Sequence, residues 1–247
     1  MSGELRIFAD EKELFAGAAA TFVDAARAVL AVRPQFSVAL AGGSTPRGLF
    51  ELLASPAYHD AIDWKKVVWF WGDERNVGAE HPDSNYRMAT EALLSHVAVD
   101  PARVHRLCGE TEPLAKAAED YQQTLAKAFG VAADGPPPSL DLVLLGMGSD
   151  GHTASLFPFT AALDEKARWV VANEVPQLST RRLTLTYPVL KAAGCVLFLV
   201  TGAGKAKVLR EVRQGPHDPR RLPSQAVDPQ GGRLLWFVDR AAASQLE

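Results

Sequence analysis

Asp150 and His152 are the residues of this sequence best placed to do chemistry. They lie two positions apart in and just after a glycine-rich stretch, 146–151, and the apolar run 142–145 before it predicts a buried strand. Open α/β sheets bind their ligands at the carboxyl ends of the strands, where this turn would lie. Free imidazole titrates near pH ~6.5, so a neutral imidazole there could accept a proton from water. The pattern therefore favours a general base at His152 over a purely structural histidine.

A second group of charged residues, which includes Asp73 and Arg75, follows the apolar run 67–71. Asp73 competes with Asp150 for the role of orienting the imidazole, and the sequence leaves that choice open. An arginine at a strand end could stabilise a developing oxyanion or hold sugar hydroxyls. A solvated turn is the alternative interpretation.

A third predicted strand, 37–41, leads into four residues that could hold a phosphate: Gly42, Gly43, Ser44 and Thr45. Thr45 suits the N-cap of a helix, and Pro46 suits its first position. The glycines let the backbone approach a ligand closely, and the start of a helix attracts an anion. An ordinary capped turn would have the same sequence, and no Gly-Lys-Ser/Thr follows, as the Walker pattern would require.

Two cations complete the candidate site. Lys205 is expected in the first turn of a helix that follows the apolar run 195–200, and Arg182 falls on the polar side of an alternating strand, 181–187. A lysine in the first turn opposes the helix dipole, and an anion bound beside it would explain its presence. We therefore predict that both side chains contact phosphate, with a solvated lysine as the alternative.

The composition is that of an ordinary globular enzyme. The chain has 247 residues, of which 47% are hydrophobic and 22% charged, and its formal net charge is −3. Mixed charges argue against a nucleic-acid or membrane surface, and no stretch reaches the roughly 18 apolar residues that a spanning helix needs. Cys108 and Cys195 lack paired spacing, so we expect neither zinc nor a disulfide framework, and a reducing cytoplasm fits. We expect no metal and no cofactor.

Short apolar runs alternate with stretches of helical period, such as 11–32 and 112–129. This alternation predicts an α/β fold with a Rossmann-like, mostly parallel sheet and helices on both faces. Further helices are expected at 86–97 and 240–246. We expect residues 1–247 to form a single domain, because the alternation resumes directly after the proline-rich stretch that ends at residue 139.

The glycine spacing of 146–151 also matches a dinucleotide-binding fingerprint. We do not expect a nicotinamide cofactor, because Asp150 and His152 would crowd a pyrophosphate and Pro158 leaves little room for a helix. Ser155 lacks the Gly-x-Ser-x-Gly surroundings of a serine nucleophile, so a covalent acyl-enzyme is not expected either.

Five blocks together resemble the 6-phosphogluconolactonase family, whose fold is shared with glucosamine-6-phosphate deaminases. The blocks cover nearly the whole chain and are 41–46, 71–75 with 83–86, 146–158, 182–184 and 202–205. The resemblance implies hydrolysis of a small sugar-phosphate lactone in the pentose phosphate pathway, with no required metal. We expect a monomer or a small homo-oligomer.

The resemblance also separates the lactonases from their relatives. Asp73 matches a catalytic aspartate of the deaminases, which also have a glutamate five residues after the histidine. Here that position is Phe157, which favours lactone hydrolysis. A deaminase or sugar-phosphate isomerase, and a sugar-phosphate-binding protein without catalysis, are the alternatives.

Overall fold

The computed structural model describes residues 3–247 and contains two β-sheets. In the larger sheet every adjacent pair of strands is parallel, so the prediction of a mostly parallel sheet is confirmed. Its strands, in spatial order, are β1 (Glu4–Phe8), β9 (Arg233–Asp239), β8 (Cys195–Val200), β5 (Leu142–Leu145), β2 (Phe36–Leu40) and β3 (Val67–Trp71).

The order of these strands determines where a ligand can bind. The chain passes from β2 to β3 on one side, whereas β5, β8 and β9 follow one another on the other side. The connections that leave β2 and β5 therefore diverge, and they leave a crevice outside the carboxyl ends of these two strands. This is the place at which the sequence puts both glycine-rich stretches.

The smaller sheet is antiparallel and contains a strand that the sequence did not predict. Asp73–Arg75, predicted only as charged site residues after a strand, forms β4 and pairs with β7 (Thr180–Leu185), which in turn pairs with β6 (Val170–Val175). The Leu185 amide donates to the Gly72 carbonyl at 2.8 Å, where the chain leaves β3. The smaller sheet is thus anchored at the carboxyl edge of the larger one.

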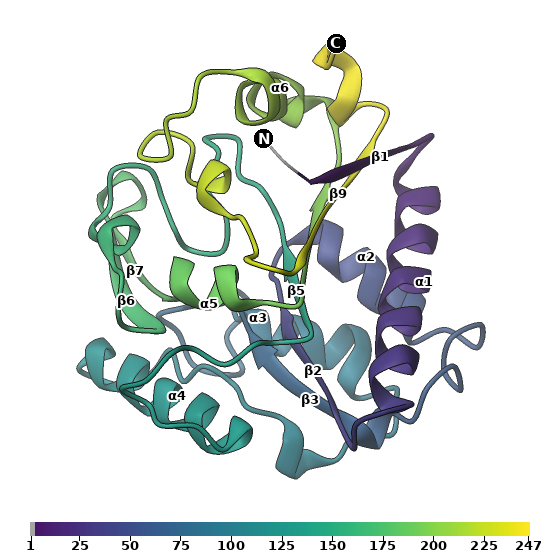
Figure 1. The fold of residues 1–247 in the computed structure, drawn as a ribbon, viewed down its shortest axis with the longest axis vertical. Coiled ribbons are helices and arrows are strands. Elements are labelled where there is room, and N and C mark those ends of the chain that lie inside the picture. Colours follow the sequence, from purple (N-terminus) through teal and green to yellow (C-terminus); the bar gives the residue numbers. More distant parts are fainter. Residues whose placement is uncertain (1–2) are drawn as a thin grey trace.

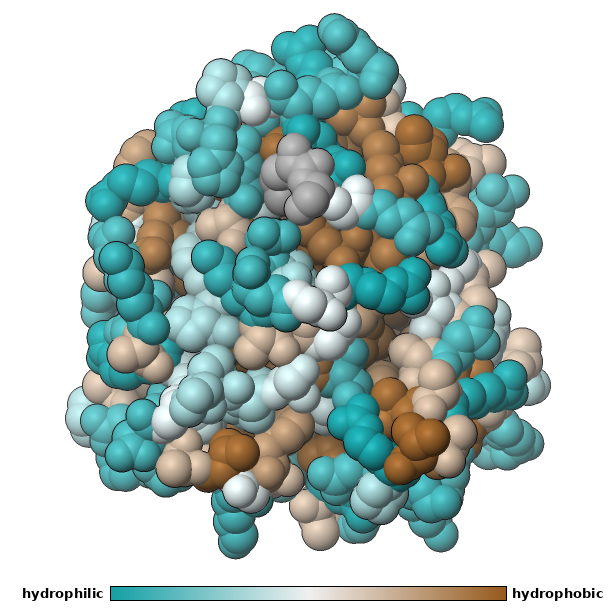
Figure 2. Space-filling model, in the orientation of Figure 1, coloured by the Kyte–Doolittle hydropathy of each residue, from teal (hydrophilic) through white to brown (hydrophobic). Residues whose placement is uncertain are grey.

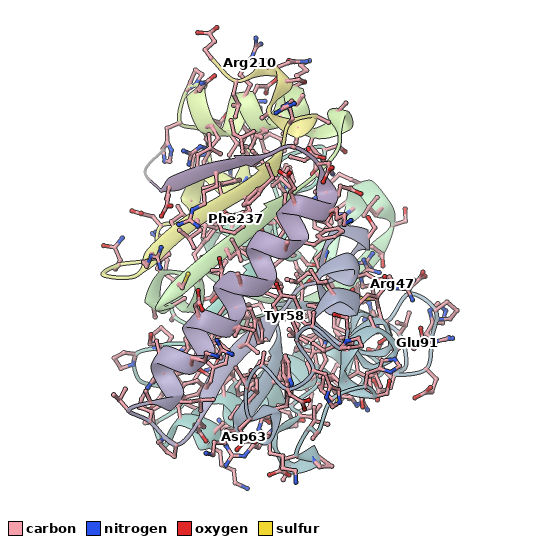
Figure 3. All side chains as sticks on the ribbon, turned by 90° about the vertical axis from the view of Figure 1, so that its right-hand side faces the viewer. Arg47, Tyr58, Asp63, Glu91, Arg210 and Phe237 are labelled. Carbon is pink, nitrogen blue, oxygen red and sulfur yellow. The ribbon has the colours of Figure 1, made fainter. Side chains whose placement is uncertain are left out.

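Helices cover both faces of the larger sheet, as predicted. Figure 1 shows α1 and α2 on one side and α4 and α5, with the smaller sheet, on the other; Figure 3 shows α1 crossing the sheet. The helices are α1 (Glu11–Leu30), α2 (Ser44–Leu53), α3 (Asn85–Ala89), α4 (Leu114–Phe129), α5 (Tyr187–Ala192) and α6 (Ala206–Gln214).

Buried aromatic side chains join the layers into one hydrophobic core. Phe198 of β8 and Trp236 of β9 stack with their ring centroids 3.9 Å apart, and Trp69 packs near Phe22 of α1. The same cluster includes Leu183 and Leu185 of β7, so the smaller sheet shares this core. The site between the sheets is therefore held from both sides by packed side chains.

Several local predictions were wrong. Gly43, not Thr45, is the N-cap of α2, because its φ of 103° turns the chain two residues earlier. The helix predicted over 86–97 is α3 followed by a π-helical turn, 90–94, and the helix predicted over 240–246 is one 3₁₀ turn, 242–245. Tyr187, expected in a strand, begins α5, since Pro188 suits a first helical turn.

In the part of the chain that the structure describes, no helix is long and apolar enough to cross a membrane. Figure 2 shows hydrophilic residues over most of one face, with apolar residues in separate groups. This distribution agrees with the ordinary composition of the chain.

The Tyr121 hydroxyl connects α4 to the end of β3. It accepts a hydrogen bond from the Trp71 amide at 2.7 Å and donates to the Trp71 carbonyl at 3.3 Å. Tyr121→Phe should lower the free energy of unfolding by about 1–3 kcal/mol, because the buried Trp71 amide loses its acceptor. Urea unfolding of the variant measures this change.

Tyr58→Phe is the matched control, because the Tyr58 hydroxyl has no hydrogen-bond partner among residues 3–247. Its expected effect is close to zero. Equal effects of the two substitutions would show that the Tyr121 contact does not support β3.

Candidate active site

The residues predicted for the site come together in one cleft of about 330 Å³ between the carboxyl edge of the larger sheet and the smaller sheet. Asp150 is the exception: its side chain is exposed to solvent, does not line the cleft and contacts His152. The predicted residues that line the cleft are Gly42, Gly43, Ser44, Thr45, Asp73, Arg75, His152, Arg182 and Lys205. Positions spread over some 160 residues of sequence are thus neighbours in the fold.

Asp150, and not Asp73, contacts the imidazole. The Nδ1 atom of His152 lies 2.6 Å from Asp150 Oδ1, and the His152 amide donates to the same oxygen at 3.1 Å. Burial alone would raise the pKa of Asp150, but the hydrogen bond and the charge of His152 outweigh it, and the pKa is lowered. A carboxylate on Nδ1 leaves Nε2 as the acceptor of a neutral ring.

Two neighbours fix the plane of the imidazole. The Phe157 ring stacks on His152 with centroids 4.0 Å apart and an angle of 24° between the planes. On the backbone side, a Cβ at Gly148 would overlap His152 Nδ1 and crowd Asp150 Oδ1. The missing side chain of Gly148 is therefore what lets Asp150 and His152 meet.

The chain after β5 continues as turns and not as a helix. Gly151 has a φ of 82°, and its carbonyl accepts from both the amide and the hydroxyl of Ser224, at 3.0 and 2.8 Å. Thr153 and Leu156 form an isolated bridge. The helix that would follow the glycines of a dinucleotide-binding motif is absent over the described stretch 146–160.

The start of α2 has the geometry of an anion cradle. The first intrahelical bond runs from the Arg47 amide to the Gly43 carbonyl, so the helix offers no acceptor to the amides of Ser44 and Thr45. The Thr45 hydroxyl lies 2.9 Å from that of Thr201, which follows β8. Thr201 also lines the cleft and was not among the predicted site residues.

Arg75 and Arg182 lie side by side on neighbouring strands of the smaller sheet. They are direct partners in the β4–β7 register, and both line the cleft. Burial, and next the charge of Arg75, lower the pKa of Arg182. Like charges in directly opposite positions destabilise a sheet, so this pair is best explained by an anion that binds both or lies near both.

Lys205 lines the cleft from the segment that follows β8. It lies in a 3₁₀ turn, Ala203–Lys205, and not in the first turn of α6 as predicted. Burial lowers its pKa, although the charge of Asp150 acts in the other direction. None of the ion pairs within residues 3–247 involves Lys205, Arg75 or Arg182. The cleft thus contains three cations that no carboxylate neutralises by direct contact.

The sequence did not identify two residues that hold Asp73. The Ser155 hydroxyl donates to Asp73 Oδ2 at 2.7 Å, and the Asn85 amide donates to the Asp73 carbonyl at 3.0 Å and to Oδ1 at 3.3 Å. All three side chains are buried, and all three residues line the cleft. Ser155 lies three positions after His152, and Asn85 belongs to the block 83–86, so both were within the motifs used for the resemblance.

Glu74 supports β4 from the face opposite to Asp73. Its carboxylate is 2% exposed and accepts from the backbone amides of Arg75, Asn85 and Tyr86, each at 2.8 Å. Burial raises the pKa of Glu74, against the effect of these bonds. The bonds tie β4 to the start of α3 and so place Asn85 beside Asp73.

No group of three or more His, Cys, Asp or Glu side chains suited to a metal ion occurs in the described chain, residues 3–247. His81 Nδ1 accepts a hydrogen bond from the Asp83 amide at 3.1 Å, which is a local turn contact.

Comparison with known proteins gives one consistent result. Residues 9–236 match the family model described as glucosamine-6-phosphate isomerases/6-phosphogluconolactonase. A 6-phosphogluconolactonase of Synechocystis sp. is 43% identical over 218 residues, which are 88% of this chain and 87% of the relative. A probable 6-phosphogluconolactonase 2 of Oryza sativa subsp. indica is 34% identical over 100% of this chain and 91% of its own length.

Solved structures agree with this result. The 6-phosphogluconolactonase from Trypanosoma cruzi superposes with a TM-score of 0.86 at 30% identity, over 99% of this chain and 97% of its own. A monomeric glucosamine-6-phosphate deaminase superposes with a TM-score of 0.80 at 21% identity, over 98% and 99% of the two chains, which shows that the fold is shared.

Gly148→Ala should separate Asp150 from His152, because the new methyl group would occupy the position of the imidazole edge. The Asp150 carboxylate would lose the hydrogen bond that lowers its pKa, so that pKa should rise. A pH titration of the Asp150 carboxyl carbon by ¹³C NMR measures the shift.

Gly146→Ala is the control in the same turn, since nothing lies within 4 Å of a Cβ at that position. It should leave the Asp150 pKa unchanged. A Gly148→Ala variant that kept the low Asp150 pKa would refute the steric explanation.

Proposed function

The chain belongs to the glucosamine-6-phosphate isomerase/6-phosphogluconolactonase family, and we propose that it hydrolyses 6-phospho-D-glucono-1,5-lactone to 6-phospho-D-gluconate, a step of the pentose phosphate pathway. The observation that carries the proposal is an imidazole hydrogen-bonded to Asp150 through Nδ1, in the same cleft as an anion cradle. Hydrolysis of a phosphorylated lactone needs both features, a base that takes a proton from water and a site that binds the phosphate dianion. We further propose that the chain is a single domain and acts in the cytoplasm as a monomer or small homo-oligomer, with no nucleic-acid partner.

In the proposed reaction His152 acts as the general base. Nε2 takes a proton from water while the water oxygen forms a bond to C1 of the lactone. The tetrahedral oxyanion then collapses, the bond from C1 to the ring oxygen breaks, and the imidazolium returns its proton to that oxygen. General-base catalysis of this kind contributes typically ~10²–10⁴-fold. Asp150 holds the ring and stabilises its charged form, as its 2.6 Å contact allows.

We assign the phosphate to the start of α2, where the cradle residues Gly42, Gly43, Ser44 and Thr45 lie, together with Lys205 and Arg182. Charge-assisted hydrogen bonds to such a group contribute about 1.5–3 kcal/mol each. Arg75 is the candidate for the developing oxyanion or for the sugar hydroxyls. Each assignment uses a cation that has no carboxylate partner in the described chain.

The main alternative is a deaminase or isomerase acting on glucosamine 6-phosphate. The position that carries a carboxylate in the resembling deaminases is Phe157 here, and this ring stacks on His152. An apolar ring cannot transfer a proton during opening of a sugar ring. Phe157 therefore favours the lactonase.

A pH-stat assay on freshly prepared 6-phosphogluconolactone tests the proposal, with ammonia release from glucosamine 6-phosphate as the competing reaction. The wild-type chain should hydrolyse the lactone and release no ammonia. His152→Asn should lower kcat by at least about 10²-fold with little change in KM, because the base is lost and the binding groups remain.

His217→Asn is the control, because His217 is exposed and lies outside the cleft. It should retain full activity. Near-normal turnover in a folded His152→Asn variant would remove His152 from the mechanism, and ammonia release by the wild type would favour the deaminase.

Lys205→Ala should weaken binding of 6-phosphogluconate by about 1.5–3 kcal/mol, because one charge-assisted contact to phosphate is lost. Lys207→Ala, which removes an exposed lysine two residues later, should have a much smaller effect. Calorimetric titration with 6-phosphogluconate and with gluconate separates the two cases. A Lys205→Ala variant that kept the full preference for the phosphorylated ligand would place the phosphate elsewhere.

A further inference from the structure

Asp73 is a buried carboxylate that the proton transfer proposed above does not use. Its residue is 8% exposed and lines the cleft, but its oxygens contact Ser155 and Asn85 and not His152. The structure gives Oδ2 one donor at 2.7 Å and Oδ1 one long donor at 3.3 Å. An ionised carboxylate accepts about four hydrogen bonds, so protein donors among residues 3–247 supply about half of this number.

The neighbours of Asp73 decide what kind of group can fill this capacity. Asp73 and Arg75 alternate with Glu74 along β4, so their side chains lie on one face, whereas Glu74 points toward the start of α3. A phosphate would be repelled by the Asp73 carboxylate. Neutral hydroxyl groups, in contrast, can donate hydrogen bonds to a buried carboxylate without charge repulsion.

The position of Ser155 indicates which hydroxyl is involved. Ser155 follows His152 by three residues in the same turn, and its hydroxyl donates to Asp73. Asp73 therefore lies on the side of the cleft near the base, where the reacting C1 would lie, and the hydroxyl next to C1 is the one on C2.

We propose that Asp73 determines specificity by accepting a hydrogen bond from the C2 hydroxyl of the lactone, and that Ser155 is a positioning residue that aims the Asp73 carboxylate. The proposal rests on the proposed lactonase function and assigns one hydroxyl within its substrate. Asn85 helps from the other oxygen, and its side chain also packs against Gly42 of the anion cradle, in the space that a Cβ there would need.

The test compares two substrates, 6-phosphogluconolactone and its 2-deoxy analogue, by kcat/KM in the pH-stat. The wild type should prefer the hydroxylated lactone by at least about tenfold, the lower end of what a hydrogen bond to a charged group gives. In Asp73→Asn this preference should fall to about two- to threefold or less, mainly through loss of activity on the hydroxylated lactone.

Ser155→Ala should reduce the same preference by about three- to tenfold, because Asp73 is no longer aimed. A purely structural role for Ser155 would lower activity on both lactones equally and leave the ratio unchanged. Thr160→Val is the matched control: it removes another buried hydroxyl from the same segment, but one that bonds the Phe157 carbonyl and Asn173 and not Asp73. Its substrate ratio should equal that of the wild type.

The outcomes separate this inference from the proposed function. A wild type that hydrolyses neither lactone contradicts the lactonase function itself. A wild type that hydrolyses both lactones equally, or an Asp73→Asn variant that keeps the full preference, overturns the role of Asp73 while leaving the lactonase intact. A folded Ser155→Ala variant with an unchanged ratio removes Ser155 from the proposal.

Discussion

The site depends on how closely the backbone at Gly148 approaches the imidazole of His152. Any side chain at that position would overlap the ring edge and crowd Asp150, so the turn can hold this pair only where a glycine stands. The glycine leaves the pair room but does not orient it. Orientation comes from the 2.6 Å contact to Asp150 on one edge and from the Phe157 ring on one face. A base held in this way needs little reorganisation before it accepts a proton.

The rest of the site consists of charged and polar groups on the two sides of the cleft between the sheets. The larger sheet contributes helix amides and Lys205, and the smaller sheet contributes Arg75, Arg182 and Asp73. Arg75 and Arg182 are direct partners in the β4–β7 register, and like charges in such positions cost stability. An anionic ligand removes this repulsion between the two arginines, so its relief contributes to the binding free energy of a sugar phosphate.

The sequence predicted what depends on local pattern and failed where distant segments meet. The strand at 142–145 and most of the helix at 11–32 were correct, because apolar runs and helical periodicity are local properties. Which aspartate contacts His152 could not be predicted, since Asp73 and Asp150 both follow strands whose spacing only the fold determines. The Arg75–Arg182 pairing joins residues more than 100 positions apart, and β4 itself has only three residues. The N-cap of α2 was misplaced because a positive φ at Gly43 outweighs the capping preference of Thr45.

Glu74 explains why two neighbouring acids in one short strand can have opposite roles. Strand geometry sends Asp73 and Glu74 to opposite faces, and the face of Glu74 is closed by three backbone amides and the Ser84 hydroxyl. Its bonding capacity is filled, so Glu74 offers nothing to a ligand and acts as a clamp between β4 and α3. Asp73 faces the cleft with capacity to spare. The difference in satisfied hydrogen bonds, and not the difference in burial, marks Asp73 as the acid that meets the substrate, because both side chains are buried.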